Sequence, residues 1–228
     1  MPENAFLSEL PEVQERGELQ VELALERLDD DLALGLGAEW GLTDAWQVEV
    51  EVGGVLDAAA TGLETVEVGV LYGRSPNETW SWAAGVGVEL RPNGLGGVPE
   101  DVVALESSVL VSWNWDGLGL FAELSGEWVT DDGDVPDGGP TSPLDASDGV
   151  EEIGDEASFG VGGFMMTSWG AWIVEVAAER ELDEDETEVA AAFGAVWRIV
   201  DDVEIGLAAV VGVDGGDDGG VATLTVEF

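Results

Sequence analysis

Carboxylate side chains dominate the chemistry available to this sequence. Asp and Glu together number 50, whereas Arg and Lys number 6, and His and Cys are absent. Without His or Cys, catalysis through Ser-His or Cys-His pairs is excluded, and so is a zinc site built on their side chains. Carboxylate pairs are so frequent that none stands out as the acid and base of a glycosidase. We therefore expect no enzyme and no cofactor, and the chemistry left to the carboxylates is the attraction of cations.

One segment concentrates oxygen ligands outside any regular pattern. Residues 130–156 contain the runs DDGDVPDGG and DGVEEIGDE. Oxygen-rich clusters suit calcium, but the spacing departs from the D-x-D-x-D-G pattern of known calcium loops. Two interpretations stay open, a calcium-binding loop and a solvated acidic loop.

The elements that position the other carboxylates are β-strands. In residues 18–28, Leu and Val alternate with Glu and Gln, and the same period of two recurs along the chain. Twelve strands are expected, most of them 9–13 residues long, which is the length of a tilted strand that crosses a bilayer. Their ranges are 18–28, 31–40, 46–52, 65–74, 79–91, 102–115, 118–129, 157–169, 171–182, 187–198, 203–213 and 220–228.

The connections and the aromatic residues predict how these strands are arranged. Short turns at 41–45, 75–78, 116–117, about Gly170 and 200–202 alternate with longer connections at 57–64, 92–101, 130–156, 183–186 and 214–219, although the first hairpin, about Asp29-Asp30, is short. Nine of the ten tryptophans lie beside the short turns, as expected for a girdle at the headgroup level of a membrane. The girdle comprises Trp40, Trp46, Trp80, Trp82, Trp113, Trp115, Trp172 and Trp197, with the C-terminal Phe228. The pattern predicts an all-β, transmembrane, antiparallel up-and-down barrel of about 12 strands in the bacterial outer membrane.

The phase opposite to the apolar side chains predicts a lumen rich in acids. The expected lumen-lining residues are Glu22, Glu49, Glu51, Glu67, Glu89, Arg91, Glu106, Glu123, Glu127, Glu175, Glu179, Arg198, Glu204 and Glu227. Glycines in the same phase, such as Gly69 and Gly87, are interpreted as relief of crowding where the sheet curves. The acidic lining either selects cations, as rings of acidic residues do, or follows from the composition of the whole chain.

Composition limits the partners. A formal net charge of -44 repels phosphate backbones, so nucleic acid is not expected. The hydrophobic content of 45% distinguishes the chain from disordered acidic proteins. Carboxylate excess without lysine is typical of proteins adapted to very high salt, where charges are screened. The first ten residues lack the basic and apolar regions of a signal peptide, so we expect the sequence to be a mature form. The expectation that the protein is exported rests on the predicted barrel instead.

Two segments resemble one family. Residues 5–26, AFLSELPEVQERGELQVELALE, resemble the start of outer-membrane transporter-like proteins described as a phenol-degradation meta-pathway channel. Residues 39–52, EWGLTDAWQVEVEV, resemble that family's strand, turn and following strand, although members usually carry lysine and histidine. The resemblance implies a barrel through which small molecules, hydrophobic ones among them, move passively.

We predict a passive outer-membrane channel for small molecules with a cation-favouring lumen. Residues 1–16 are expected to be a periplasmic or plug segment and 17–228 the barrel. Expected partners are membrane lipid, a small or cationic solute and, through the last strand, the outer-membrane assembly machinery. The alternatives are a structural or adhesive barrel acting through its acidic outer loops, and a soluble acidic β-barrel with the alternation turned inside out.

Overall fold

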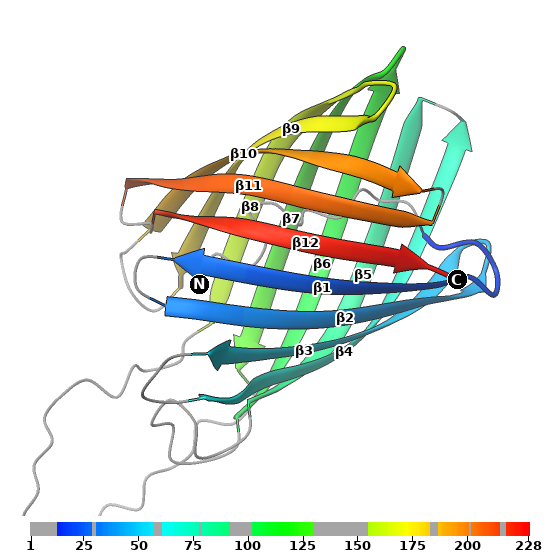
Figure 1. Cartoon of the computed structure of the whole chain (residues 1–228). Helices are drawn as coiled ribbons and strands as arrows, with labels where there is room; N and C mark the ends of the chain where they lie inside the picture. The colour runs from blue at the N-terminus through cyan, green and yellow to red at the C-terminus, as the bar shows by residue number, and fades with distance from the viewer. Residues whose placement is uncertain are drawn as a thin grey trace, which may run out of the picture.

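The chain forms one closed antiparallel barrel of twelve strands in the computed structural model, and each strand pairs with its neighbours in sequence (Figure 1). The structure describes residues 13–28, 31–56, 61–77, 79–91, 102–129, 155–182, 187–200, 202–214 and 218–228. The strands are β1 (Leu19–Leu28), β2 (Asp31–Thr43), β3 (Trp46–Leu56), β4 (Thr61–Asn77), β5 (Trp80–Arg91), β6 (Val102–Trp115), β7 (Leu118–Val129), β8 (Glu156–Met166), β9 (Gly170–Glu181), β10 (Thr187–Val200), β11 (Val203–Asp214) and β12 (Gly219–Glu227).

Closure of the barrel joins the first and last strands. The backbone N–H of Leu19 donates to the carbonyl of Phe228 (3.2 Å), and the N–H of Phe228 donates to the carbonyl of Leu19 (2.8 Å). The pairing of β1 with β12 then continues up to Leu28 opposite Gly219. The sheet consequently has no free edge, as a barrel in hydrocarbon requires.

The short turns are built by local residue chemistry. Asp116 and Gly117 both have positive φ, 47° and 80°, which is the two-residue hairpin turn that Asp-Gly favours. The Thr43 hydroxyl accepts from the N–H groups of Ala45 and Trp46, and the Asn77 side chain accepts from those of Thr79 and Trp80. These turns share the end of the barrel at which the chain terminates, called the turn end here; the opposite end is the loop end.

The outward face carries the apolar side chains. Leu36 is 49% exposed, Val86 65% and Leu124 59%, although each lies in the middle of a strand. Such exposure in water would be a severe aggregation hazard, whereas in a bilayer it is the expected surface. The alternative of a soluble barrel is therefore wrong, and the all-β transmembrane fold with twelve strands is confirmed. Within the described residues no helix is long and apolar enough to cross a bilayer.

Several strand ends differ from those predicted. β3 continues past the predicted end at residue 52 to Leu56, and β4 begins at Thr61, within the predicted connection 57–64. At its other end β4 continues through Asn77 into the predicted turn 75–78. Strand β8 ends at Met166 rather than at residue 169, because Thr167 turns the chain by bonding to the Gly170 carbonyl (2.9 Å). Hydrogen bonds from Asn77 and Thr167, rather than the alternation of side chains, decide the ends of β4 and β8 at these two turns.

Candidate functional site

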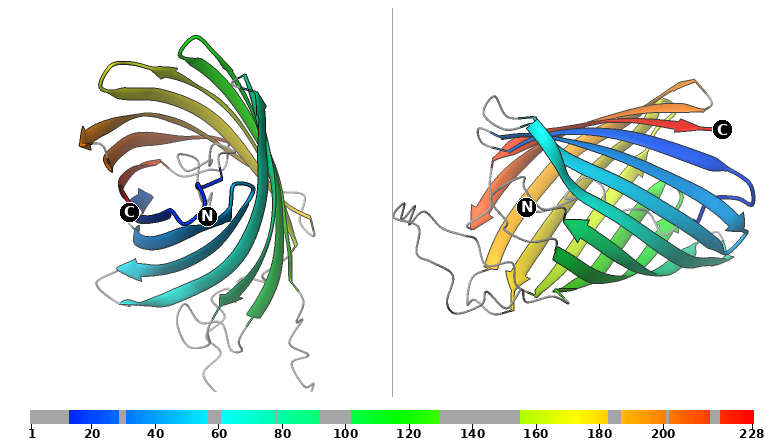
Figure 2. Two further views of the ribbon diagram at one scale, coloured as in Figure 1. Left: turned by 90° about the vertical axis from the view of Figure 1, so that its right-hand side faces the viewer. Right: turned by 90° about the horizontal axis from the view of Figure 1, so that it is seen from below.

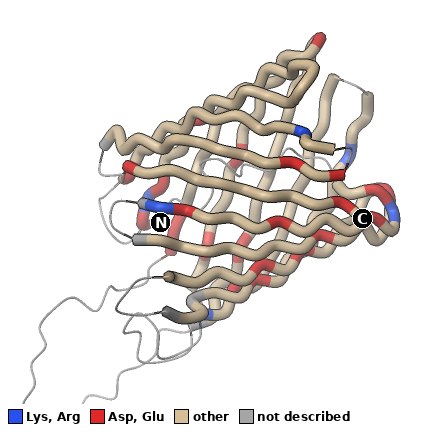
Figure 3. The backbone as a smooth tube through the Cα atoms, viewed as in Figure 1, with Lys and Arg blue, Asp and Glu red and all other residues tan. Residues whose placement is uncertain are grey.

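The inward face encloses a cavity of about 470 Å³. The lining includes every glutamate expected there, namely Glu22, Glu49, Glu51, Glu67, Glu89, Glu106, Glu123, Glu127, Glu175, Glu179, Glu204 and Glu227. Arg91 and Arg198 stand beside it, paired with Glu127 and Glu204 respectively at 2.9 Å. Acidic positions recur on many strands, whereas basic ones are few (Figure 3).

The lining contains polar residues that the sequence reasoning did not name. They include Gln20, Glu39, Thr65, Ser108, Ser125, Glu156, Ser158, Glu188, Thr223 and Thr225. Glu39 has the same phase as the inward glycines of its strand, so the alternation itself could have identified it. Glu156 could not be found in that way, because the expected loop 130–156 extended over it. Residues 130–154, and with them the question of calcium binding by that loop, lie outside the described residues.

Sheet register arranges many of these acids into one oblique row. Gln20 lies opposite Glu39, and Glu39 lies opposite Glu49. Across Gly69 and Gly87 the row continues to Glu106, which lies opposite Glu127, and Glu127 lies opposite Glu156. A second row beside it aligns Glu51 with Glu67 and Glu67 with Glu89. We call this set the acidic band; its members are Glu22, Glu39, Glu49, Glu51, Glu67, Glu89, Glu106, Glu127 and Glu156.

The acidic band runs from one end of the barrel to the other. Glu39 lies four residues before the turn-end terminus of β2, whereas Glu156 is the loop-end residue of β8. A row perpendicular to the strands climbs along the barrel because strands in a closed barrel are tilted. Carboxylates are therefore present at successive depths of one wall, rather than in a single ring.

Two glycines leave room for carboxylates within the band. A Cβ at Gly87 would lie 2.7 Å from Glu67 Oε1, and a Cβ at Gly69 would lie 3.3 Å from Glu49 Oε2. Curvature was the expected reason for glycine at these positions. The structure adds a second reason, because a larger residue at Gly87 would displace the neighbouring carboxylate.

The described part of the N-terminal segment folds against the inner face at the turn end. Val13 packs on the buried Leu71, Ala83 and Leu110. The Gln14 N–H donates to Gln47 Oε1 at 2.7 Å, and the Gln14 side chain donates to Gln20 and Glu39. Figure 2 shows this stretch inside the ring of strands when the barrel is viewed along its length.

Glycine also provides the seat for this segment. A Cβ at Gly41 would lie 2.0 Å from the Glu15 carbonyl oxygen, and one at Gly73 would lie 2.3 Å from Val13 Cγ2. The Gly17 N–H donates to the Gly41 carbonyl (2.7 Å), and Gly17 itself has a φ of +88°. The segment 13–17 is thus held by backbone as well as side-chain contacts and narrows the turn end of the lumen.

The expected girdle lies on the outer face around the turn end. Trp115 is 68% exposed and Phe228 74%, and the rings of Trp80 and Trp113 stack with centroids 6.2 Å apart. Trp169 stacks on Trp197 at 6.1 Å. Except for the half-buried Trp197, the girdle residues named from the sequence are exposed: Trp40, Trp46, Trp80, Trp82, Trp113, Trp115, Trp172 and Phe228. Amphipathic rings in such a collar match the headgroup level of a bilayer.

Solved structures with the same architecture come from bacterial outer membranes. The barrel aligns with the outer-membrane channel COG4313 from Pseudomonas putida F1 (TM-score 0.65, 11% identity, covering 95% of this chain and 97% of that one). It also aligns with the KdgM porin (TM-score 0.64, 8% identity, covering 92% and 99%) and the NanC porin (TM-score 0.63, 13% identity, covering 91% and 98%). The chain has the fold of an outer-membrane porin. The sequence matches no family model and no curated protein.

Proposed function

We propose that this chain is a passive outer-membrane channel for small solutes, and that its lumen favours cations. The observation that carries the proposal is the acidic band, because its carboxylates follow one another from the turn end to the loop end. Carboxylates along a narrow passage lower the energy of a cation at each depth and raise that of an anion. No catalytic or cofactor role is proposed.

The acidic lumen of this chain is ill suited to the ligand that one barrel of the same fold has been solved with. The KdgM porin has been solved in complex with disordered oligogalacturonate, a chain of acidic sugars. The band here would repel such a polyanion over the whole length of the passage. The shared fold therefore supports a channel, and the acidic lining supports a different class of solute, small cations and uncharged polar molecules.

Other expectations from the sequence stay predictions. They include membership of the phenol-degradation channel family, a host adapted to very high salt, and recognition of β12 and Phe228 by the assembly machinery. The narrowing by residues 13–17 supports the interpretation of residues 1–16 as a plug segment over a periplasmic tail. An adhesive role would depend on residues 130–154, so no described contact favours it.

Planar-bilayer recording of the purified chain tests the proposal. With a KCl gradient across the bilayer, we expect a steady conductance whose reversal potential shows preference for K⁺ over Cl⁻. The preference should weaken as the salt is raised to molar concentration, because screening shortens the reach of the carboxylates. A sealed barrel without current, or a preference for Cl⁻, would contradict the proposal.

A further inference from the structure

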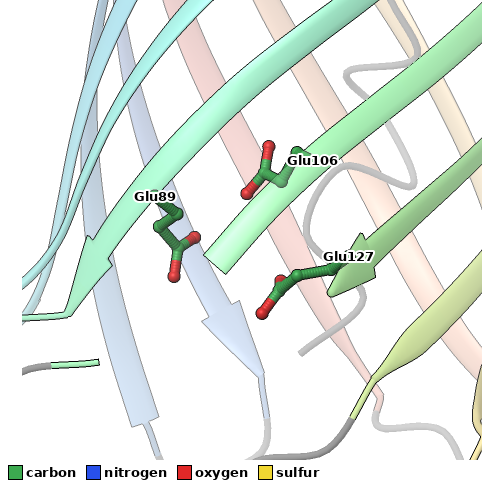
Figure 4. A group of neighbouring side chains, drawn as sticks. All are labelled: Glu89, Glu106 and Glu127. Atoms are coloured by element: carbon green, nitrogen blue, oxygen red, sulfur yellow. The ribbon is translucent and has the colours of Figure 1, made fainter. Parts of the chain in front are cut away.

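Three members of the acidic band converge near the loop end. Glu89 of β5, Glu106 of β6 and Glu127 of β7 each place a carboxylate oxygen within 4.8 Å of the other two (Figure 4). We call them the three-glutamate cluster. Glu89 is 2% exposed, and the other two are half-buried, so the cluster is part of the wall rather than of a solvated loop.

A cation of the chain itself is seated at this cluster. Arg91 Nη2 donates to both carboxylate oxygens of Glu127, at 2.9 and 3.0 Å, and Arg91 Nε donates to Glu89 Oε1. One guanidinium therefore links two of the three carboxylates, from strands that are not neighbours. A planar, permanently charged group with several donors suits this position better than lysine would.

The spacing of the three carboxylates also suits a divalent ion. Calcium binds oxygens at about 2.3–2.6 Å, so ligand oxygens on opposite sides of the ion stand about 5 Å apart. Oxygens within 4.8 Å of one another meet that limit, and three carboxylates offer up to six of the six to eight ligands that calcium takes. A divalent ion held by three carboxylates would stay in the passage and oppose the movement of other ions, since conduction requires sites that release their ion.

We propose that Arg91 is a selectivity-determining residue. Its guanidinium is a monovalent cation attached to the chain, and it occupies the position at which the three-glutamate cluster would otherwise bind a divalent ion. Because its own chain carries it, the guanidinium cannot leave or be exchanged, and it lowers the negative charge of the cluster without filling the lumen. The consequence for ion movement rests on the proposed channel function. The consequence for divalent-ion binding is independent of whether the barrel conducts.

The other lumen arginine supplies the matched control. Arg198 pairs with Glu204 at 2.9 Å near the turn end, and its side chain is 59% exposed against 23% for Arg91. The only group of three or more acids within metal-binding reach in the described residues is that beside Arg91. Removing Arg198 changes the net charge of the lumen by the same amount, without uncovering such a cluster.

Equilibrium binding of Ca²⁺ to the folded full-length chain in detergent tests the inference independently of conduction. We expect Arg91→Gln to gain a site that binds Ca²⁺ about tenfold or more tightly than any site of the wild type. The gain should be lost in Arg91→Gln combined with Glu106→Gln, and should be absent in Arg198→Gln and in Arg91→Lys. Circular dichroism of the strands checks folding, and if Arg91→Gln does not fold, Arg91→Met replaces it.

Two results would overturn the inference. One is a Ca²⁺ titration of the neutral Arg91 variant that matches the wild type, and the other is an equal gain in Arg198→Gln, which would indicate a general charge effect. Bilayer recording then adds the functional consequence, since micromolar to millimolar Ca²⁺ should block K⁺ current in Arg91→Gln but not in the wild type. A wild type without current would remove the proposed channel, while the binding difference would still decide the role of Arg91.

Discussion

Two sides of the lumen are built from the same kind of antiparallel strand but differ in the side chains that they present. The acidic band lies on β1 to β8, whereas the inward face of β9 to β12 carries a patch of small and apolar side chains. This face also contains five lining glutamates, namely Glu175, Glu179, Glu188, Glu204 and Glu227. The patch, called the apolar wall, consists of Ala190, Ala192, Val210 and Val221, with Ile173, Ala177, Val196 and Ala208 packed against them. Ala190, Ala192 and Val210 are each 3% exposed.

The difference teaches that a closed sheet can concentrate charge on one part of its circumference and apolar packing on another. Side chains of the apolar wall pack on one another, so this side gains from burial as a soluble core does. Carboxylates of the band need water, an arginine or a hydrogen-bond donor beside them, since an unpaired charge in an apolar place is costly. Glu22 illustrates this, since it accepts a hydrogen bond from the Thr225 hydroxyl at 3.0 Å. Ions are therefore expected to follow one side of the passage.

Neutralising the band is expected to have the largest effect on function. Replacing Glu39, Glu49 and Glu106 by Gln keeps the size of each side chain and removes three charges along the passage. The ratio of K⁺ to Cl⁻ permeability, obtained from the reversal potential in a KCl gradient, should fall several-fold toward one, in proportion to the charges removed. Ala190→Ser on the apolar wall is the matched control and should leave the reversal potential unchanged. Equal shifts in both variants would show that the band has no special role.

Placing an acid in the apolar wall tests the comparison from the other side. Ala192→Glu would add a charge among packed apolar side chains, next to Glu175 on the neighbouring strand. We expect a loss on the order of 3 kcal/mol in the free energy of unfolding, from desolvation and like-charge repulsion. Urea unfolding of the barrel in lipid vesicles measures it. Ala24→Glu, on the half-buried cavity lining of β1, should cost much less, and similar losses at the two positions would contradict the distinction.

Displacing the N-terminal segment should change conductance with less effect on selectivity. The Cβ of Gly41→Ala would meet the Glu15 carbonyl oxygen at 2.0 Å, so residues 13–17 must shift away from the wall. Single-channel conductance should rise because the turn end becomes wider. Gly37→Ala, four residues earlier on the same face of the same strand, is the control. Its Cβ would come no closer than 3.9 Å to Glu22, so this variant should behave as the wild type. Unchanged conductance in Gly41→Ala would mean that this segment does not limit flow.

The smallest expected effect concerns the outer face, which both regions share. Trp113→Leu removes the stacking partner of Trp80 and one amphipathic ring of the girdle. Such aromatic pairs contribute about 0.5–1.5 kcal/mol beyond their buried area, so the free energy of unfolding in vesicles should fall by about 1 kcal/mol. Ion selectivity should stay the same, because the side chain faces away from the lumen. A changed reversal potential would indicate that the strand had shifted in register.

Individual residues show which features of the lumen the alternation of side chains can predict and which it cannot. Glu106 and Glu127 were expected in the lumen from the phase of their strands, and both line the cavity. On β10 the run from Val189 to Phe193 is apolar in both phases, so no alternation marked which residues form the apolar wall. The pairing of Arg91 with Glu127, 36 residues apart, was likewise beyond the pattern, because it depends on the stagger of β5 to β7.

The amino-acid sequence by itself determined the strands, their number, the outward apolar belt and the inward carboxylates, because a period of two places alternate residues on opposite faces of any strand. Only the tertiary structure decided the order of those carboxylates in space. Closure of the barrel sets the tilt and stagger of every strand, and that stagger aligns distant glutamates into one oblique band, seats Arg91 among three of them, and brings residues 13–17 against Gly41.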